Sequence, residues 1–277
     1  MSSAPRSQHT DSRSTGPAPA SQTGSPLDGR RAVVTGGGSG IGEAACRALA
    51  DAGATVVVLD RDEDNARRVA DDIGGEAVVA DLLDTDALAS LDLGGEHGAA
   101  VDILVNNAGI QKVAPIPEFP LEDFRRIQTI MVEAPFILVK SVLPGMYERG
   151  FGRIVHVSSV HGLRASAFKS GYVTAKHAIE GFSKVTALEG AEHGVTSNCV
   201  NPGYVLTPLV EKQIADQAAA HGIGEQEVVE KVFLQDTAIK RMAEPSEVGA
   251  LVAFLCGPQA GMITGSSYVM DGGWTAH

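Results

Sequence analysis

The sequence contains few cysteines, and their placement excludes two kinds of site. The 277-residue chain has three, Cys46, Cys199 and Cys256, which lie far apart and lack the spacing of metal ligands. An odd number of cysteines without a paired pattern is typical of a reducing compartment rather than of a secreted disulfide framework. We therefore expect a cytoplasmic protein without a metal site.

Basic residues and long apolar runs are also scarce. Lys and Arg together number 22 against 34 Asp and Glu, which gives a formal net charge of −12. A surface that binds nucleic acid should be basic, so this balance argues against a nucleic-acid partner. No uninterrupted apolar run approaches the roughly 18 residues of a membrane-spanning helix, so we expect no membrane partner. Hydrophobic residues still make up 44% of the chain, which is enough for a sizeable core.

Residues 1–26 differ in composition from the rest of the chain. They are rich in Ser, Thr, Pro, Ala and Gln and have almost no large apolar side chains. Such a segment cannot bury enough surface to offset the entropy lost on ordering, so we predict a disordered tail. It lacks the apolar centre of a secretory signal. Its arginines and serines are similar to those of a transit peptide, but the amphipathic periodicity is missing.

From residue 31 onward, short apolar runs alternate with longer helical stretches. Runs without polar alternation predict strands buried on both faces, as in a parallel sheet covered by helices. We predict one α/β domain over residues 27–277, a single Rossmann-type doubly wound parallel sheet of about seven strands flanked by helices. A helical stretch at about 206–240 follows a strand end and predicts a substrate lid. The predicted strands are 32–34, 55–59, 77–80, 101–105, 153–157, 195–200 and 267–270.

A glycine-rich turn follows the first predicted strand. Its sequence is Thr35-Gly36-Gly37-Gly38-Ser39-Gly40-Ile41-Gly42. Glycines at 36, 40 and 42 allow a tight turn and a close approach to a pyrophosphate, and the next helix presents unpaired N–H groups there. The spacing is not the commoner G-x-G-x-x-G, and a glycine-rich turn alone is weak support. Its position between a strand and a helix favours a nucleotide site.

Two acidic residues end the next two strands. Asp60 can accept hydrogen bonds from the adenosine ribose, and its charge would repel a 2′-phosphate, so we expect NAD rather than NADP. The adjacent Arg61 could compensate such a phosphate. Asp81 could accept a hydrogen bond from the adenine amino group. Each acid could instead cap the helix that begins nearby.

Motifs at the later strand ends complete the pattern. They are Asn106-Asn107-Ala108-Gly109 after the fourth strand, Ser159 after the fifth, Tyr172-Val173-Thr174-Ala175-Lys176 thirteen residues later, and Pro202-Gly203 after the sixth. With the glycine-rich turn, they resemble the short-chain dehydrogenase/reductase family across residues 27–277. The resemblance implies an NAD-dependent oxidoreductase, a homotetramer, and a catalytic set of Ser159, Tyr172 and Lys176. It also implies cofactor contacts from Leu82, Asn107, Tyr172, Lys176, Pro202, Gly203, Val205 and Thr207.

The catalytic set suits oxidation of an alcohol. Tyr172 and Lys176 are four residues apart and share one helix face. A neighbouring ammonium favours the phenolate, and lowering a tyrosine pKa from about 10 to about 7 takes about 4 kcal/mol. Tyr172 would remove the hydroxyl proton while Ser159 holds the substrate oxygen. By itself, the Tyr–Lys spacing is better explained by a core tyrosine and a surface lysine.

A narrower resemblance points to the substrate. The segments 108–111, 159–163, 165–170, 207–213 and 271–276 resemble the bacterial D-3-hydroxybutyrate dehydrogenases, one branch of the family. That resemblance implies that Gln111, His161, Lys169 and Gln213 surround a substrate carboxylate. Tyr204 and Trp274 could wall its apolar end, or serve only in packing. The leading hypothesis is oxidation of D-3-hydroxybutyrate to acetoacetate, and the nearest alternative is another hydroxy acid, a sugar or a secondary alcohol.

One residue departs from the family pattern. The family usually has an asparagine in the central helix that supports a water-linked proton relay, and the matching position here is Met131. Methionine cannot donate or accept in that role as an amide does. The departure keeps open a hypothesis of another class, a nucleotide-binding regulator without turnover.

Overall fold

The computed structural model describes residues 24–93, 101–208, 210–211, 214, 218 and 223–276, and all of their side chains except that of residue 232. Within these residues one parallel sheet has the strand order β3-β2-β1-β4-β5-β6-β7. This confirms the predicted doubly wound fold. The strands are β1 (Arg31–Thr35), β2 (Thr55–Asp60), β3 (Glu76–Val79), β4 (Ile103–Asn106), β5 (Gly152–Val157), β6 (Val195–Pro202) and β7 (Ser267–Met270). Residues 1–23 of the predicted tail lie outside the described residues.

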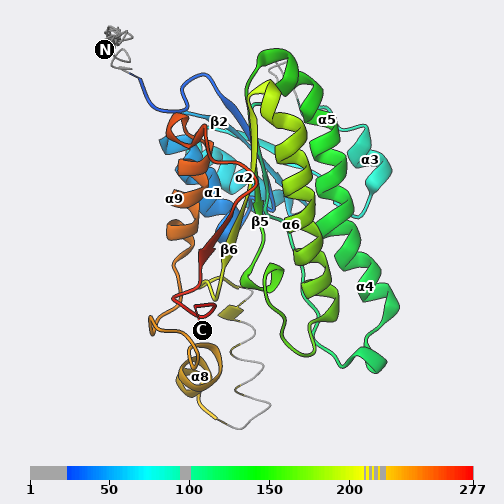
Figure 1. The fold of residues 1–277 in the computed structure, drawn as a ribbon, viewed down its shortest axis with the longest axis vertical. Helices are drawn as coiled ribbons and strands as arrows, with labels where there is room; N and C mark the ends of the chain where they lie inside the picture. The colour runs from blue at the N-terminus through cyan, green and yellow to red at the C-terminus, as the bar shows by residue number, and fades with distance from the viewer. Residues whose placement is uncertain are drawn as a thin grey trace, which may run out of the picture.

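Helices cover both faces of the sheet (Figure 1). They are α1 (Gly40–Asp51), α2 (Glu63–Ile73), α3 (Thr85–Ala89), α4 (Leu121–Gln128), α5 (Ala134–Arg149), α6 (Ser170–Gly190), α8 (Glu225–Val228) and α9 (Pro245–Cys256). Figure 1 shows α1, α2 and α9 on one face and α4, α5 and α6 on the other. Two apolar clusters match these layers, one joining α1 and α9 to the sheet and one joining α5 and α6 to it.

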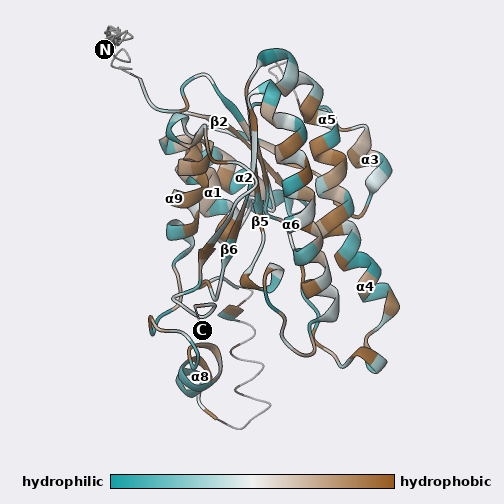
Figure 2. Cartoon of the chain, in the orientation of Figure 1, coloured by the Kyte–Doolittle hydropathy of each residue, from teal (hydrophilic) through white to brown (hydrophobic). Residues whose placement is uncertain are grey.

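The alternation of side chains along the strands supplies both clusters. Val34 points into the cluster beneath α1, and its neighbour Val33 points into the cluster beneath α5. Both are fully buried. Figure 2 shows the same arrangement, with apolar residues on the central strands and on the helix surfaces that face them. A strand that is buried on both faces needs no alternation of apolar and polar residues, which is why apolar runs predicted several of the strands. On β6 the polar side chains of Thr196, Ser197 and Asn198 are buried as well.

The edge strands are the exception to this prediction. Residues of β3 alternate between partly buried and exposed, and Val79 is 50% exposed. On β7, Val269 is 42% exposed. The expectation of burial on both faces is therefore wrong for the two edges, because each edge strand has a neighbouring strand on one side only.

The longest helical stretch combines three segments. Helix α4, the π-turn η2 (Thr129–Glu133) and α5 form one helix over 121–149, long and apolar enough by length and composition to cross a membrane. Ile127, Leu138 and Met146 along it are buried in the cluster beneath α5. The stretch is therefore a core helix packed on the sheet.

Candidate active site

The turn between β1 and α1 has a geometry that only glycine tolerates at several points. Gly36 and Gly40 have φ values of 63° and 55°, in the left-handed region. A Cβ atom on Gly42 would lie 2.0 Å from the carbonyl oxygen of Gly36. The turn and the first turn of α1 therefore pack against each other without side chains between them. Backbone N–H groups at this helix end are suited to a phosphate.

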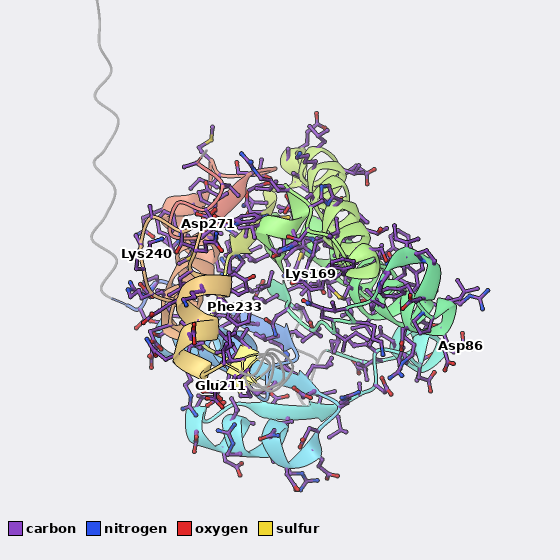
Figure 3. The ribbon with its side chains drawn as sticks, turned by 90° about the horizontal axis from the view of Figure 1, so that it is seen from below. Asp86, Lys169, Glu211, Phe233, Lys240 and Asp271 are labelled. Atoms are coloured by element: carbon purple, nitrogen blue, oxygen red, sulfur yellow. The ribbon has the colours of Figure 1, made fainter. Side chains whose placement is uncertain are left out.

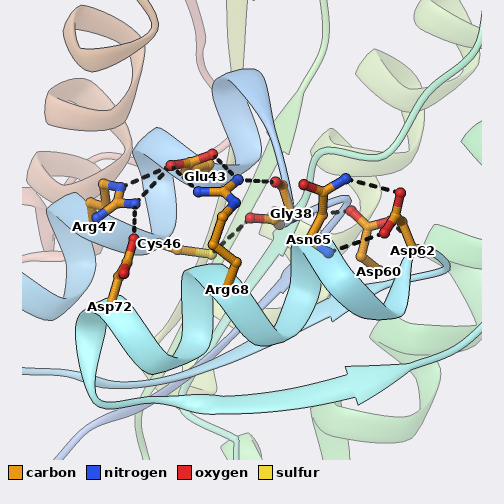
Figure 4. A network of polar contacts seen from close by, with 10 residues as sticks. Gly38, Glu43, Cys46, Arg47, Asp60, Asp62, Asn65, Arg68 and Asp72 are labelled. Atoms are coloured by element: carbon orange, nitrogen blue, oxygen red, sulfur yellow. Dashed lines mark hydrogen bonds and ion pairs between the residues drawn. The ribbon is translucent and has the colours of Figure 1, made fainter.

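Asp60 braces this turn (Figure 4). Its Oδ2 accepts the N–H of Gly38 at 2.9 Å, and its Oδ1 accepts the N–H of Asp62 at 3.1 Å. The cap of α2 is Asp62, whose side chain accepts the N–H of Asn65 at 3.0 Å. The alternative that Asp60 caps this helix is therefore wrong. Its carboxylate lies instead beside the turn, in the lining of a cavity.

Arginine 68 supports the turn from the other side. From α2, its guanidinium donates to the carbonyl oxygen of Gly38 at 3.0 Å and pairs with Glu43 of α1 at 2.8 Å. Glu43 also accepts from Arg47, which pairs with Asp72 (Figure 4). The amide and the carbonyl of residue 38 are thus both bonded, so the turn is held in one conformation.

Asp81 and Asn107 make two further contacts in the part of the cavity that lies beside the glycine-rich turn. Asp81 lines the cavity after β3, and its Oδ1 accepts the N–H of Leu83 at 3.0 Å, while α3 is capped by Asp84. Asp81 is therefore not the cap of α3. Asn107 donates through Nδ2 to the carbonyl oxygen of Thr35 at 2.9 Å, which ties the end of β4 to the end of β1. The strand order reverses at this pair, where α/β sheets commonly bind ligands.

The predicted catalytic residues meet at the end of β5. Ser159 follows this strand, and Tyr172 and Lys176 lie on the first turns of α6. Lys176 Nζ lies 5.4 Å from the centre of the Tyr172 ring and donates to the carbonyl oxygen of Val157 at 2.6 Å. Tyr172 and Ser159 share a side-chain hydrogen bond. All three line the same cavity as Asp60.

Burial is the main cause of the pKa shifts of Tyr172 and Lys176. It lowers the pKa of Lys176 to about 8, although Cys199 and Glu180 act in the opposite direction. It raises the pKa of Tyr172 above its ordinary value, against the hydrogen bond from Ser159. Burial is the largest effect on the pKa of Tyr172 in this structure, and the lowering predicted from Lys176 together with an oxidised nicotinamide stays a prediction. In a dry site both charged forms are disfavoured, and the ammonium is already bonded to a backbone oxygen.

A buried polar network fixes the backbone of Ser159. Asn201 on β6 donates through Nδ2 to the carbonyl oxygen of Ser159 at 2.9 Å and to Glu180 of α6 at 2.5 Å. Ser267 on β7 donates to the other oxygen of Glu180 at 2.6 Å. The network joins two strands and a helix directly behind Ser159.

A cationic and aromatic wall lies opposite the nucleotide end. Lys169 lines the cavity, and burial lowers its pKa. The preceding Phe168 has a φ of 68°, and its carbonyl oxygen accepts the N–H of Ala114 at 2.9 Å. A bulky residue in this region is uncommon, and such strain is concentrated at functional sites. Figure 3 labels Lys169 together with Phe233 and Asp271, which come from different segments.

His161 forms the centre of this wall. It is buried, its Nε2 lies 2.9 Å from Ser166 Oγ, and its ring stacks on Trp274 with a 6.0 Å separation of centres. Burial, together with the charge of Lys169, lowers the pKa of His161 to about 4. Tyr204 stacks on Phe233 at 4.4 Å. The imidazole is thus neutral near pH 7 and can act as a hydrogen-bonding group.

The predicted site residues converge on one cavity of about 380 Å³. Those in its lining are Gly36, Ser39, Gly40, Ile41, Asp60, Asp81, Leu82, Asn107, Gln111, Ser159, His161, Lys169, Tyr172, Lys176, Pro202, Gly203, Tyr204, Val205, Thr207 and Trp274. Gly42 does not line it and acts through close packing. Gln213 lies outside the described residues, so its prediction stays open. A cavity that joins a glycine cradle to an acid, a tyrosine and lysines fits a dinucleotide and an anionic alcohol.

Known proteins are similar to this chain in sequence and fold. The family described as short chain dehydrogenase matches residues 30–218. The chain belongs to this family. A D-beta-hydroxybutyrate dehydrogenase of Rhizobium meliloti is 44% identical over 255 residues, which cover 89% of this chain and 99% of the relative. A protein of the same name from Cupriavidus necator is 41% identical over 261 residues, covering 90% and 99%.

A solved structure of a related dehydrogenase supports the fold and the cofactor class. It comes from Beutenbergia cavernae, is provisionally named an NAD(P)-dependent gluconate 5-dehydrogenase, and holds NADP at low occupancy. The two chains are 35% identical with a TM-score of 0.79, over 91% of this chain and 98% of the other. The present chain is therefore an oxidoreductase of a family that uses nicotinamide cofactors.

Met131 is the residue predicted to stand where the resemblance implies an asparagine. It is 4% exposed, within the π-turn η2 and in the cluster beneath α5. Its methyl group would contact a Cβ atom placed on Gly109 at 3.5 Å. The side chain thus fills apolar space behind the Asn107 loop, where an amide would need hydrogen-bond partners.

Several residues of this short-chain dehydrogenase site were not predicted. Glu180 and Asn201 act behind Ser159, and Asp271 and Thr237 enter the cavity lining. Asp271 had a signal, because an acid before two glycines near a strand end is typical of a tight turn. The pairing of Glu180 with Asn201 had none, since the two are twenty-one positions apart in sequence.

Proposed function

We propose that this protein oxidises a short 3-hydroxy acid with NAD, and that the main reaction converts D-3-hydroxybutyrate to acetoacetate. One observation carries the proposal. The lysine amine of Lys169 and the neutral imidazole of His161 line the same cavity as Ser159 and Tyr172. A cation gives a carboxylate a charge-assisted contact while the hydroxyl of the same small molecule meets the catalytic pair. The names of the two bacterial relatives agree with this substrate.

The chain supplies position and proton transfer. Ser159 holds the substrate oxygen and Tyr172 accepts the hydroxyl proton. The amine of Lys176 lies beside the Tyr172 ring. The nicotinamide, when bound, accepts the hydride from the carbinol carbon. Gln111 and Gln213 are proposed to add hydrogen bonds to the carboxylate, and the segment 206–240 is proposed to cover it.

The test is reduction of NAD, followed as absorbance of the reduced cofactor, with each enantiomer of 3-hydroxybutyrate. We expect turnover with the D enantiomer and at least tenfold less with the L enantiomer. Protein that binds NAD but oxidises neither enantiomer would refute the substrate. A panel of other hydroxy acids, sugars and cyclic alcohols then identifies the alternative, and no turnover with any of them would favour a regulator.

A lysine variant tests the carboxylate site. Lys169→Ala removes the cation, and a charge-assisted hydrogen bond contributes about 1.5–3 kcal/mol, so kcat/KM should fall by about tenfold or more. Lys184→Ala, at an exposed position on α6, is the matched control. Equal kcat/KM for both variants on the true substrate means that the substrate has no carboxylate at this position.

The choice of NAD over NADP depends on Asp60. Its carboxylate already lies beside the turn and would repel a 2′-phosphate, while Arg61 in the same lining would attract one. We expect wild type to prefer NAD, and Asp60→Asn to reduce the preference by about tenfold. Comparison of kcat/KM with NAD and NADP decides, and a wild-type preference for NADP would contradict the assignment.

We also propose a cytoplasmic homotetramer. Apolar side chains are exposed on two separate surfaces, Phe136, Val185 and Leu188 on α5 and α6, and Phe254 and Met262 near α9. Two exposed apolar surfaces would support two kinds of twofold contact, which together make a tetramer. The three cysteines are free and buried, as suits a reducing compartment. Light scattering on wild type and Leu188→Glu is the test, and a monomeric wild type would contradict it.

A further inference from the structure

The C-terminal segment 271–276 lies against the substrate end of the cavity. Asp271 Oδ1 accepts the N–H of Gly273 at 2.8 Å, and Oδ2 accepts the N–H and the hydroxyl of Thr275 at 2.7 and 2.6 Å. Burial alone would raise the pKa of Asp271, but the hydrogen bonds from Thr275 and Gly273 lower it. The segment is thus a tight turn built on one carboxylate, and Trp274 lies at its tip.

Two other parts of the chain hold this turn. The carbonyl oxygen of Gly272 accepts the N–H groups of Ala238 and Ile239 at 2.8 and 2.9 Å. On the opposite side, Arg164 donates through Nη2 to the carbonyl oxygen of Thr275 at 3.0 Å. Arg164 follows the short helix η3 (Val160–Gly162), and its own N–H bonds to the carbonyl oxygen of Val160 at 2.9 Å.

The Arg164 bond therefore connects the C-terminal turn to the segment that carries His161. Between these two anchors, Trp274 stacks on His161 with an angle of 18° between the rings. His161 in turn contacts Tyr172 edge-on at 6.0 Å. An uninterrupted series of contacts thus runs from an exposed arginine to the residue that takes the substrate proton.

We propose that segment 271–276 is a clasp over the substrate end of the cavity, and that Arg164 is the positioning residue that keeps it closed. Arg164 does not line the cavity, so it acts through Thr275 and Trp274. A closed clasp fixes the indole on His161 and limits the length of the acid that fits beyond it. The part of this inference that concerns the acid rests on the proposed function, whereas the placement of Trp274 does not.

The composition of the chain offers a direct measurement. Trp274 is the single tryptophan, so fluorescence excited at a wavelength that tyrosine does not absorb reports on this turn. The variants are Arg164→Ala, which opens the clasp, and Arg164→Lys, which keeps a cationic donor. Arg126→Ala, at an exposed position on α4, is the matched control.

We expect Arg164→Ala to raise the acrylamide quenching constant of Trp274 about twofold, with a red-shifted emission maximum. Its KM for the acid should rise about tenfold with kcat within twofold, because a charge-assisted hydrogen bond that acts before and during reaction is lost. Its preference for 3-hydroxybutyrate over 3-hydroxyhexanoate should fall. Arg164→Lys should restore most of each change, and the control should match wild type.

The two readouts separate the possible failures. Unchanged quenching in Arg164→Ala means that the arginine does not hold the turn, which overturns the proposal whatever the substrate is. Increased quenching with an unchanged KM and an unchanged chain-length preference also overturns it, because the turn then moves without affecting the substrate. If wild type oxidises an alcohol other than 3-hydroxybutyrate, the kinetic arm uses that alcohol and a longer homologue.

Discussion

Removal of one buried imidazole should change how strongly acid destabilises the protein. His156 on β5 is fully buried, its Nδ1 lies 3.3 Å from Asn106 Nδ2, and its Nε2 has no hydrogen-bond partner among the described residues. Burial and the nearby charge of Lys176 lower its pKa to about 3. The ordinary value near 6.5 applies to the unfolded chain, so below pH 6.5 the unfolded state binds more protons than the folded state.

The magnitude follows from this difference. Each pH unit below 6.5 costs about 1.36 kcal/mol until the folded pKa is reached, so at pH 5.5 the folded state loses about 1.4 kcal/mol relative to pH 7.5. His161, with a folded pKa of about 4, loses a similar amount over the same range. Carboxylates with a lowered pKa, such as Glu43, lose their contribution only at lower pH. The two histidines together should therefore cost about 3 kcal/mol between pH 7.5 and pH 5.5.

The assay is urea unfolding followed by circular dichroism at both pH values and one protein concentration, since an oligomer's stability depends on concentration. His156→Asn keeps an amide for Asn106 and cannot titrate, so its pH-dependent loss should be about half that of wild type. His193→Asn, at an exposed position, should keep the full loss. If His156→Asn loses as much free energy of unfolding between pH 7.5 and pH 5.5 as wild type does, the reasoning is refuted. The imidazole of His156 would then titrate equally in the folded and unfolded states.

Three other substitutions test separate parts of the site. Gly42→Ala places a Cβ atom 2.0 Å from the carbonyl oxygen of Gly36, so calorimetry should show NAD binding weakened about 100-fold. Tyr172→Phe removes the proton acceptor, and kcat should fall by about 10²- to 10⁴-fold while NAD affinity is kept; an active variant would exclude this role. Glu180→Gln removes the charge from a carboxylate that accepts two hydrogen bonds, from Asn201 and Ser267, so urea unfolding should show a loss of about 1–3 kcal/mol.

The fold could be predicted because its signal is local. Apolar runs such as 56–59 carry no polar alternation, and these four positions of β2 are all buried. The edges were not predicted correctly, because exposure of Val79 depends on which strands become neighbours, and a run of four residues contains no information about strand order.

The sequence predicted which residues form the candidate site, but not their pKa values or their capping roles. Helical spacing predicts that Tyr172 and Lys176 share a face, and they do. It contains no information about burial, so it did not predict that burial raises the pKa of Tyr172. The N-terminal cap of α2 was ambiguous for a similar reason. Asp60 and Asp62 are both plausible caps from sequence, and only the course of the backbone brings Asp62 to the N–H of Asn65.

Burial shifts the pKa values of Tyr172 and Lys176 in directions that bear on the proposed proton transfer. Burial disfavours phenolate and ammonium separately, which is why the pKa of Tyr172 is raised and that of Lys176 is lowered to about 8. An adjacent phenolate and ammonium form a neutral pair, whose mutual attraction is strongest where water is excluded. A cationic nicotinamide beside them would favour the phenolate further. In the proposed reaction, the same dry environment that suppresses ionisation of the tyrosine alone would make its ionisation most sensitive to a bound oxidised cofactor, and proton removal would then be coupled to the presence of the hydride acceptor.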